Sequence, residues 1–96
     1  MNIEKEAIAE FNAGNGTVDA TEQPLHEVGV NVNKHVVVRA DSGIGSETIT
    51  VGPTGRAAQG FVLNPGEQTP PIYVDNTDKI GVIGSTTNLA YSWIAN

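Results

Sequence analysis

The stretch VGVNVNKHVVVRA, residues 28–40, decides the fold class of this chain. From Val28 to Val32, valines alternate with small or polar residues, which is the period-two pattern of a strand with one buried face. From His35 to Ala40, three consecutive valines indicate a strand that is buried on both faces near the centre of a sheet. A tight reversal at residues 33–34 joins the two segments, so the stretch predicts two successive antiparallel strands.

The same pattern continues to the end of the chain. Further strands are predicted at residues 47–51, 60–63, 71–75, 80–83 and 89–94, separated by turn sequences rich in glycine and proline. Pro70 and Pro71 place the start of the 71–75 strand at a sheet edge, because proline cannot donate a ladder hydrogen bond. About seven short antiparallel strands at this spacing predict an all-β fold, either a β-sandwich or a small barrel.

The N-terminal residues have a different character. Residues 1–27 hold six acidic side chains against one lysine, and therefore most of the formal net charge of −6. Ile3, Ala7, Ile8 and Phe11 recur at helical spacing and predict a short amphipathic helix, which the turn-like sequence of residues 12–16 should end. We therefore expect an acidic arm with a short helix over residues 1–24 and the β domain over residues 25–96.

The predicted arm helix needs a surface to dock on. A helix of about nine residues is unstable alone in water, so the apolar side chains Ile3, Ile8 and Phe11 should contact something. That surface is either the chain's own β domain or a partner protein.

Length and composition limit what the chain can be. The 96 residues allow one domain, and with no cysteine in the sequence neither a disulfide nor thiol chemistry is available. A core of this size is marginal alone, which favours a homo-oligomer or a docked partner. No basic patch offers a site for nucleic acid, no apolar run is long enough to cross a membrane, and no signal-peptide pattern is present.

The sequence shows no catalytic or metal-binding pattern. His26 and His35 have no carboxylate at metal-ligand spacing, and residues 43–45 precede a β-patterned segment where a phosphate loop would need a helix. Asp75 and Asp78 flank a predicted turn and are best explained as turn residues. We therefore expect a protein that is not an enzyme and that holds no metal and no cofactor.

The aromatic residues are the remaining candidates for binding. Tyr73, Tyr91 and Trp93 are possible interface or ligand aromatics, because exposed rings stack on sugars and anchor protein interfaces. In a domain so poor in aromatic residues, Trp93 is expected in the core or at a subunit interface, with sugar binding as the alternative.

The β region resembles a known class of proteins. The segments HVVVRA (35–40), ETITVGPTG (47–55), GFVLNPGE (60–67), PIYVDNTDKIGVIG (71–84) and LAYSWIAN (89–96) are similar in order and type to those of small virion proteins of tailed bacteriophages. The resemblance is to capsid decoration (cement) and head-fibre proteins. It covers residues 28–96 as a pattern of strands and turns.

The resemblance implies a structural role in the virion, after synthesis in the host bacterial cytoplasm. The expected function is capsid decoration, with the major capsid protein or another virion protein as partner and a trimer as the favoured oligomer. The alternative is a receptor- or carbohydrate-binding module, or an adaptor, on a phage tail or fibre. A third hypothesis is an intracellular adaptor or inhibitor that uses its acidic charge.

Overall fold

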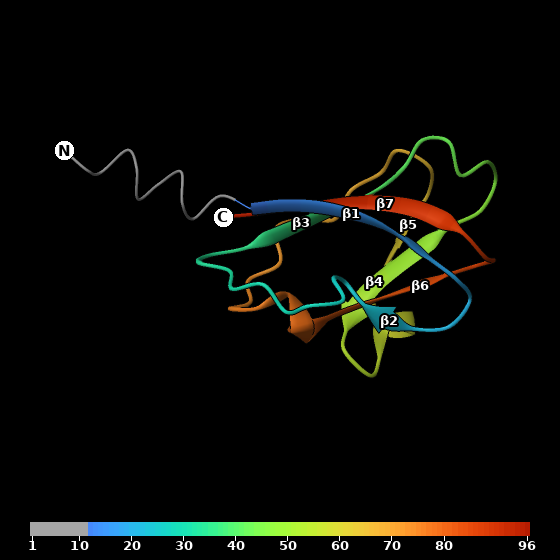
Figure 1. The fold of residues 1–96 in the computed structure, drawn as a ribbon. Coiled ribbons are helices and arrows are strands. Elements are labelled where there is room, and N and C mark those ends of the chain that lie inside the picture. The colour runs from blue at the N-terminus through green and yellow to red at the C-terminus, as the bar shows by residue number, and fades with distance from the viewer. Residues whose placement is uncertain (1–11) are drawn as a thin grey trace.

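The chain folds into two antiparallel sheets that pack face to face (Figure 1). The computed structural model describes residues 12–96. The strands are β1 (Asn12–Val18), β2 (Gln23–Pro24), β3 (Val36–Ala40), β4 (Ile49–Pro53), β5 (Phe61–Leu63), β6 (Ile80–Gly84) and β7 (Leu89–Ala95), with 3-10 turns η1 (Ala57–Gln59) and η2 (Thr77–Lys79). One sheet has the order β1-β7-β3 and the other β2-β6-β4-β5. The predicted all-β sandwich of seven antiparallel strands is confirmed.

Two of these strands lie where no strand was predicted. β1 and β2 fall in the segment expected to be an arm, and the supposed turn at residues 12–16 is the first part of β1. β1 pairs with β7 and β2 pairs with β6, so residues 12–24 contribute to both sheets of the domain. The predicted helix and its docking residues Ile3, Ile8 and Phe11 lie outside the described residues.

Two predicted strands are absent from residues 12–96. The segments 28–32 and 71–75 make only isolated bridges, Asn31 with Asn76 and Ile72 with Val36. The exposed Val28 breaks the expected buried face, since 68% of its surface is accessible. The two segments run along the flanks of the sandwich, where they cover its sides without forming a ladder.

The glycines of β1 allow this strand to pack against two aromatic rings of β7. Gly14 and Gly16 face into the sandwich and pair in register with Trp93 and Tyr91 of β7. A Cβ atom at Gly14 would lie 2.7 Å from Trp93 ring atoms, and one at Gly16 would lie 3.0 Å from the Tyr91 hydroxyl. Only glycine leaves room for these two rings against β1.

The position of β3 also differs from the prediction. β7, not β3, is the central strand of its sheet, and β3 lies at the edge. Its free edge is covered by residues 66–72. Val36 exchanges two backbone bonds with Ile72, both 2.8 Å long, and the Val38 N–H donates to Thr69 Oγ1 at 3.0 Å. Because this segment pairs with its outer edge, β3 has backbone partners on both sides, as a central strand does, while Val36 and Val38 lie in the core and Val37 is half-buried.

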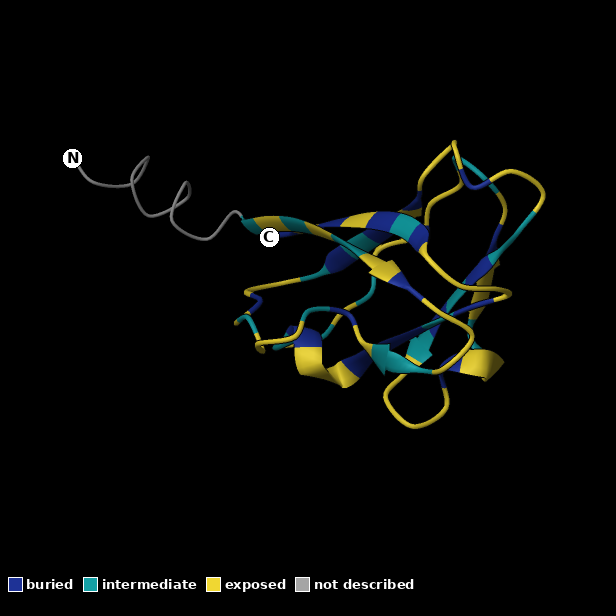
Figure 2. Cartoon of the chain, turned by 45° about the vertical axis from the view of Figure 1, so that its right-hand side comes forward, coloured by how far each residue is buried: buried dark blue, intermediate teal, exposed yellow. Residues whose placement is uncertain are grey.

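The core lies between the two sheets (Figure 2). The inward side chains of β7 share one face as the sequence predicted, with Leu89, Tyr91 and Trp93 each no more than 5% exposed. They pack against buried aliphatic residues of β3, β4 and β6. These side chains are therefore shielded from solvent between the sheets.

Polar side chains fasten the loops around this core. The Glu22 carboxylate accepts hydrogen bonds from the backbone N–H groups of Ala57 and Gly55, which hold the pKa of Glu22 below its usual value. This contact ties the β1–β2 connection to the turn after β4.

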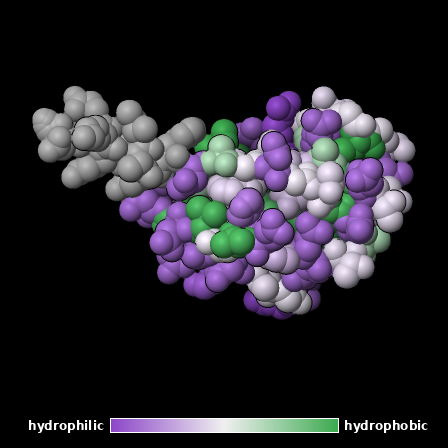
Figure 3. All heavy atoms as spheres, in the orientation of Figure 1, coloured by the Kyte–Doolittle hydropathy of each residue, from purple (hydrophilic) through white to green (hydrophobic). Residues whose placement is uncertain are grey.

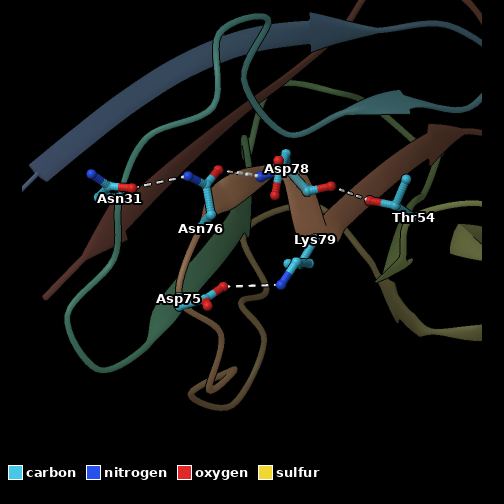
Figure 4. A network of polar contacts seen from close by, with 6 residues as sticks. All are labelled: Asn31, Thr54, Asp75, Asn76, Asp78 and Lys79. Carbon is cyan, nitrogen blue, oxygen red and sulfur yellow. Dashed lines mark hydrogen bonds and ion pairs between the residues drawn. The ribbon is translucent and has the colours of Figure 1, made fainter.

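A second polar network fixes the turn around η2 (Figure 4). Asn76 Nδ2 donates to Asn31 Oδ1 at 3.1 Å, its Oδ1 accepts from the Asp78 N–H at 3.0 Å, and Thr54 Oγ1 donates to the Asp78 carbonyl at 2.6 Å. The network holds the turn that was predicted around Asp75 and Asp78.

Candidate assembly interface

The residues considered for chemistry have structural roles. No group of three or more His, Cys, Asp or Glu side chains in residues 12–96 is arranged to hold a metal ion. The rings of His26 and His35 lie edge-on to Trp93 and Tyr73, with centroids 5.6 and 5.7 Å apart. Over the same residues, no helix is long and apolar enough to cross a membrane.

The remaining charged pair near these sites lies on the surface. Asp75 forms an exposed ion pair with Lys79 at 3.0 Å, and the ammonium group lowers the pKa of Asp75 through its hydrogen bond and charge. An exposed pair of this kind adds little to stability. It also leaves Asp75 ionised rather than poised as an acid.

Two of the three candidate aromatics are inside the protein. Trp93 is 2% exposed, and its Nε1 has no hydrogen-bond partner among residues 12–96. The Tyr91 hydroxyl donates to the Leu25 carbonyl, and burial raises the pKa of this phenol. Neither ring can stack on a ligand, whereas Tyr73 is exposed. Of the two predicted positions for Trp93, core or subunit interface, the structure shows the core.

The outer edge of β1 is the most distinctive surface of the fold. The direction of the β1 hydrogen bonds can be inferred from the bonds that β7 makes on its other side, toward β3. There the Ala90 carbonyl accepts from the Asp41 N–H, and Asn96 exchanges two backbone bonds with His35. Backbone groups of an antiparallel strand point alternately to its two neighbours. Leu89, Tyr91, Trp93 and Ala95 therefore direct their backbone bonds to β1.

The register of β1 with β7 shows which β1 residues direct their backbone groups to β7 and which direct them to the free edge. Asn12, Gly14, Gly16 and Val18 bond to β7, and Ala13, Asn15 and Thr17 direct their N–H and C=O groups to the free side. The Thr17 carbonyl accepts from Gln23 Nε2 at 2.8 Å, which agrees with this direction. No hydrogen bond within residues 12–96 reaches the outward groups of Ala13 and Asn15.

β1 also lacks the features by which proteins protect a sheet edge. Its seven residues contain no charged side chain and no proline, and its register with β7 is unbroken by a bulge. The outward positions carry the small, neutral and exposed side chains of Ala13, Asn15 and Thr17. An edge of this kind is a template for an additional strand.

The other sheet edges in residues 12–96 are short or covered. Residues 66–72 satisfy the outward groups of β3, which include Ala40 through Gly66 and Glu67. β2 has two residues and contains Pro24, and β5 has three residues. β1 is therefore the long open edge of the described structure.

Space is available beside this edge. A hollow of about 400 Å³ lies between Asn15–Gly16 of β1 and residues 23–27. It has polar and apolar walls and opens to solvent. A backbone approaching β1 would meet a partly preformed groove.

Exposed apolar side chains lie in separate patches (Figure 3). On β5, Phe61 and Val62 are 47% and 59% exposed, and Phe61 borders an apolar hollow of about 220 Å³ with Ile72 and Val74. On β7, Ile94 is half exposed between Ala13 and Val37 of the neighbouring strands.

Comparison with known proteins gives no family. No family model matches the chain, and no curated protein matches its sequence. Among solved structures, a chain described under "Bacillus endospore appendages form a novel family of disulfide-linked pili" aligns with a TM-score of 0.44 at 16% identity, covering 90% of this chain and 84% of that one. A chain from "Crystal structure of PirA" aligns with a TM-score of 0.33 at 20% identity, covering 88% and 83%.

These comparisons correct the functional expectation. The prediction of a capsid decoration protein, with its tail or fibre alternative, is corrected, because the matched structures are described as Bacillus endospore appendages and PirA and not as phage capsid proteins. The first of these structures is described as a family of disulfide-linked pili. The present chain has no cysteine in its 96 residues.

The interface strand was missed because its glycines were interpreted as a turn. A signal was present: Gly14 and Gly16 are two residues apart, as are Tyr91 and Trp93. Glycines opposite aromatic residues are a recognised cross-strand combination in sheets. Matching the two spacings would have suggested that β1 pairs with β7.

Proposed function

We propose that this chain is a non-catalytic structural subunit that assembles with other copies through the edge of β1. The observation that supports this most directly is the set of unpaired backbone groups at Ala13 and Asn15, on an edge without charge, proline or bulge. Strand addition to such an edge gives affinity through backbone hydrogen bonds.

The character of the edge favours a polypeptide partner. Backbone N–H and C=O groups at strand spacing match another strand. The acidic chain, with its net charge of −6, repels nucleic acid. The buried Tyr91 and Trp93 leave no aromatic platform on β7 for a sugar ring.

The contact through β1 buries little surface, which limits its affinity. A stable interface buries about 800 Å² on each partner, and seven residues of edge strand bury less. We therefore expect reversible association with a Kd in roughly the micromolar to millimolar range.

Sedimentation velocity of the full chain over a range of concentrations tests the proposal. Asn15→Glu places a charge on the open edge and should weaken association, because charged edge residues oppose strand pairing. Ser92→Glu is the matched control, since Ser92 is exposed on the same face, directly opposite Asn15, but lies on the central strand. Equal association of the two variants would show that β1 is not the contact.

A further inference from the structure

We infer that the strand added to β1 is β1 of a second copy, antiparallel to the first, with a two-fold axis through the pair of Asn15 residues. This inference rests on the proposed function and specifies which element of the partner the edge meets. It is carried by the hydrogen-bond register of β1, by the neutrality of its outward side chains and by the lengths of the other edges.

The outward groups of two β1 strands are complementary. With the axis at Asn15, Asn15 pairs with Asn15 of the partner subunit and Ala13 pairs with Thr17 of the partner subunit. All three residues direct backbone groups to the free side, so each pair exchanges two bonds. The Thr17 carbonyl already accepts from Gln23 and would share its second lone pair. This register overlaps the full length of the strand.

The side chains permit the same pairing. Ala13, Asn15 and Thr17 are exposed, small and uncharged, so the strands can approach without like-charge repulsion although each chain is acidic. The two Asn15 carboxamides would lie opposite each other and could exchange hydrogen bonds. The short edges of β2 and β5 offer a second copy two and three residues of pairing, against seven on β1.

This geometry ends the assembly at two copies on this edge. The joined sheet would have the order β3-β7-β1-β1-β7-β3, with β3 at both outer edges. Residues 66–72 already satisfy the outward backbone groups of β3. A closed two-fold dimer follows, rather than a sheet that grows along its edge.

A charge-exchange experiment tests the axis. In the pair, Asn15→Lys and Asn15→Glu each place like charges opposite one another, so each variant alone should have its dimer Kd raised about tenfold or more. An equimolar mixture places lysine opposite glutamate and should return the Kd to within about threefold of the unchanged chain. Sedimentation velocity measures each Kd, and unchanged melting temperatures show that both variants fold.

Amide hydrogen exchange supplies a second measurement. As the concentration of the unchanged chain rises, protection of the Ala13 and Asn15 amides should increase. Gly14 and Gly16, which already bond to β7, should remain protected throughout.

The outcomes separate the inference from the proposed function. If the unchanged chain dimerises and each single variant does not, but the mixture fails to recover, β1 remains the contact and the two-fold pairing is overturned. Growth of the unchanged chain into larger oligomers through β1 would also overturn the closed pair. A chain that stays monomeric at millimolar concentration overturns both.

Discussion

Replacing Gly14 by alanine tests the packing that makes β1 a strand. The added Cβ would lie 2.7 Å from Cε2 and Nε1 of Trp93, whereas unstrained carbon contacts are about 3.5–4.0 Å. The ring is buried and has little room to retreat, so the strand or the ring must shift by about 1 Å. Overpacking of this kind costs about 1–3 kcal/mol, offset by about 0.4–1 kcal/mol from the less flexible unfolded chain.

The net expectation is a loss of about 1–2 kcal/mol of unfolding free energy, which lowers the Tm by roughly 4–16 °C for a domain of this size. The loss of unfolding free energy is measured by urea unfolding, followed by the fluorescence of the single tryptophan. Gly43→Ala is the control, because its Cβ meets only the exposed Asp41 carboxylate, at 2.8 Å, and this side chain can turn away at the cost of its hydrogen bond from the Gly43 N–H.

A double-mutant cycle isolates the cause. Trp93→Phe removes Nε1 and the fused ring, so Gly14→Ala should cost less in that background than in the original chain. If Gly14→Ala is no more destabilising than Gly43→Ala, or if its cost is unchanged beside phenylalanine, the close approach of ring and glycine does not determine the strand.

Three further predictions concern the polar contacts that close the fold. Hydrogen bonds lower the pKa of Glu22 in the folded state, so the stability that this carboxylate adds is present above its unfolded pKa of 4.5 and is lost as the pH falls through the folded pKa. Glu22→Gln should therefore remove this part of the acid dependence of the unfolding free energy, measured from pH 7 to 3. Tyr91→Phe should cost about 1–2 kcal/mol by leaving the Leu25 carbonyl unpaired, and it should also remove the loss of stability that ionisation of this phenol causes above its unfolded pKa of 10.0. Thr69→Val should cost about 1–3 kcal/mol because the buried Val38 N–H loses its acceptor, whereas Thr69→Ser should retain most of the stability; equal unfolding free energies for the two variants would contradict this.

The sequence by itself determined the fold class and much of the second half of the chain. Short runs of apolar residues located β4, β5, β6 and β7 to within a few residues. Burial alternates with period two in β4 and β7, whereas β6 is buried along most of its length and β5 is buried only at Leu63. The turns between them were also readable, since proline and glycine restrict the backbone locally. The shared inward face of Leu89, Tyr91 and Trp93 was correct for the same reason.

Only the tertiary structure decided the edges, and the proposed interface lies on one of them. Gly14 and Gly16 have no side chain to make a periodic pattern, so β1 is visible only through the rings of Trp93 and Tyr91 that pack over it from a strand more than seventy residues away. The outward backbone groups of β3 are satisfied by residues 66–72, a contact that no local pattern encodes. The period of a strand indicates which of its side chains are buried. An open edge, in contrast, is defined by unpaired backbone groups, which every residue carries. It can therefore be recognised only when the strands beside it have been placed.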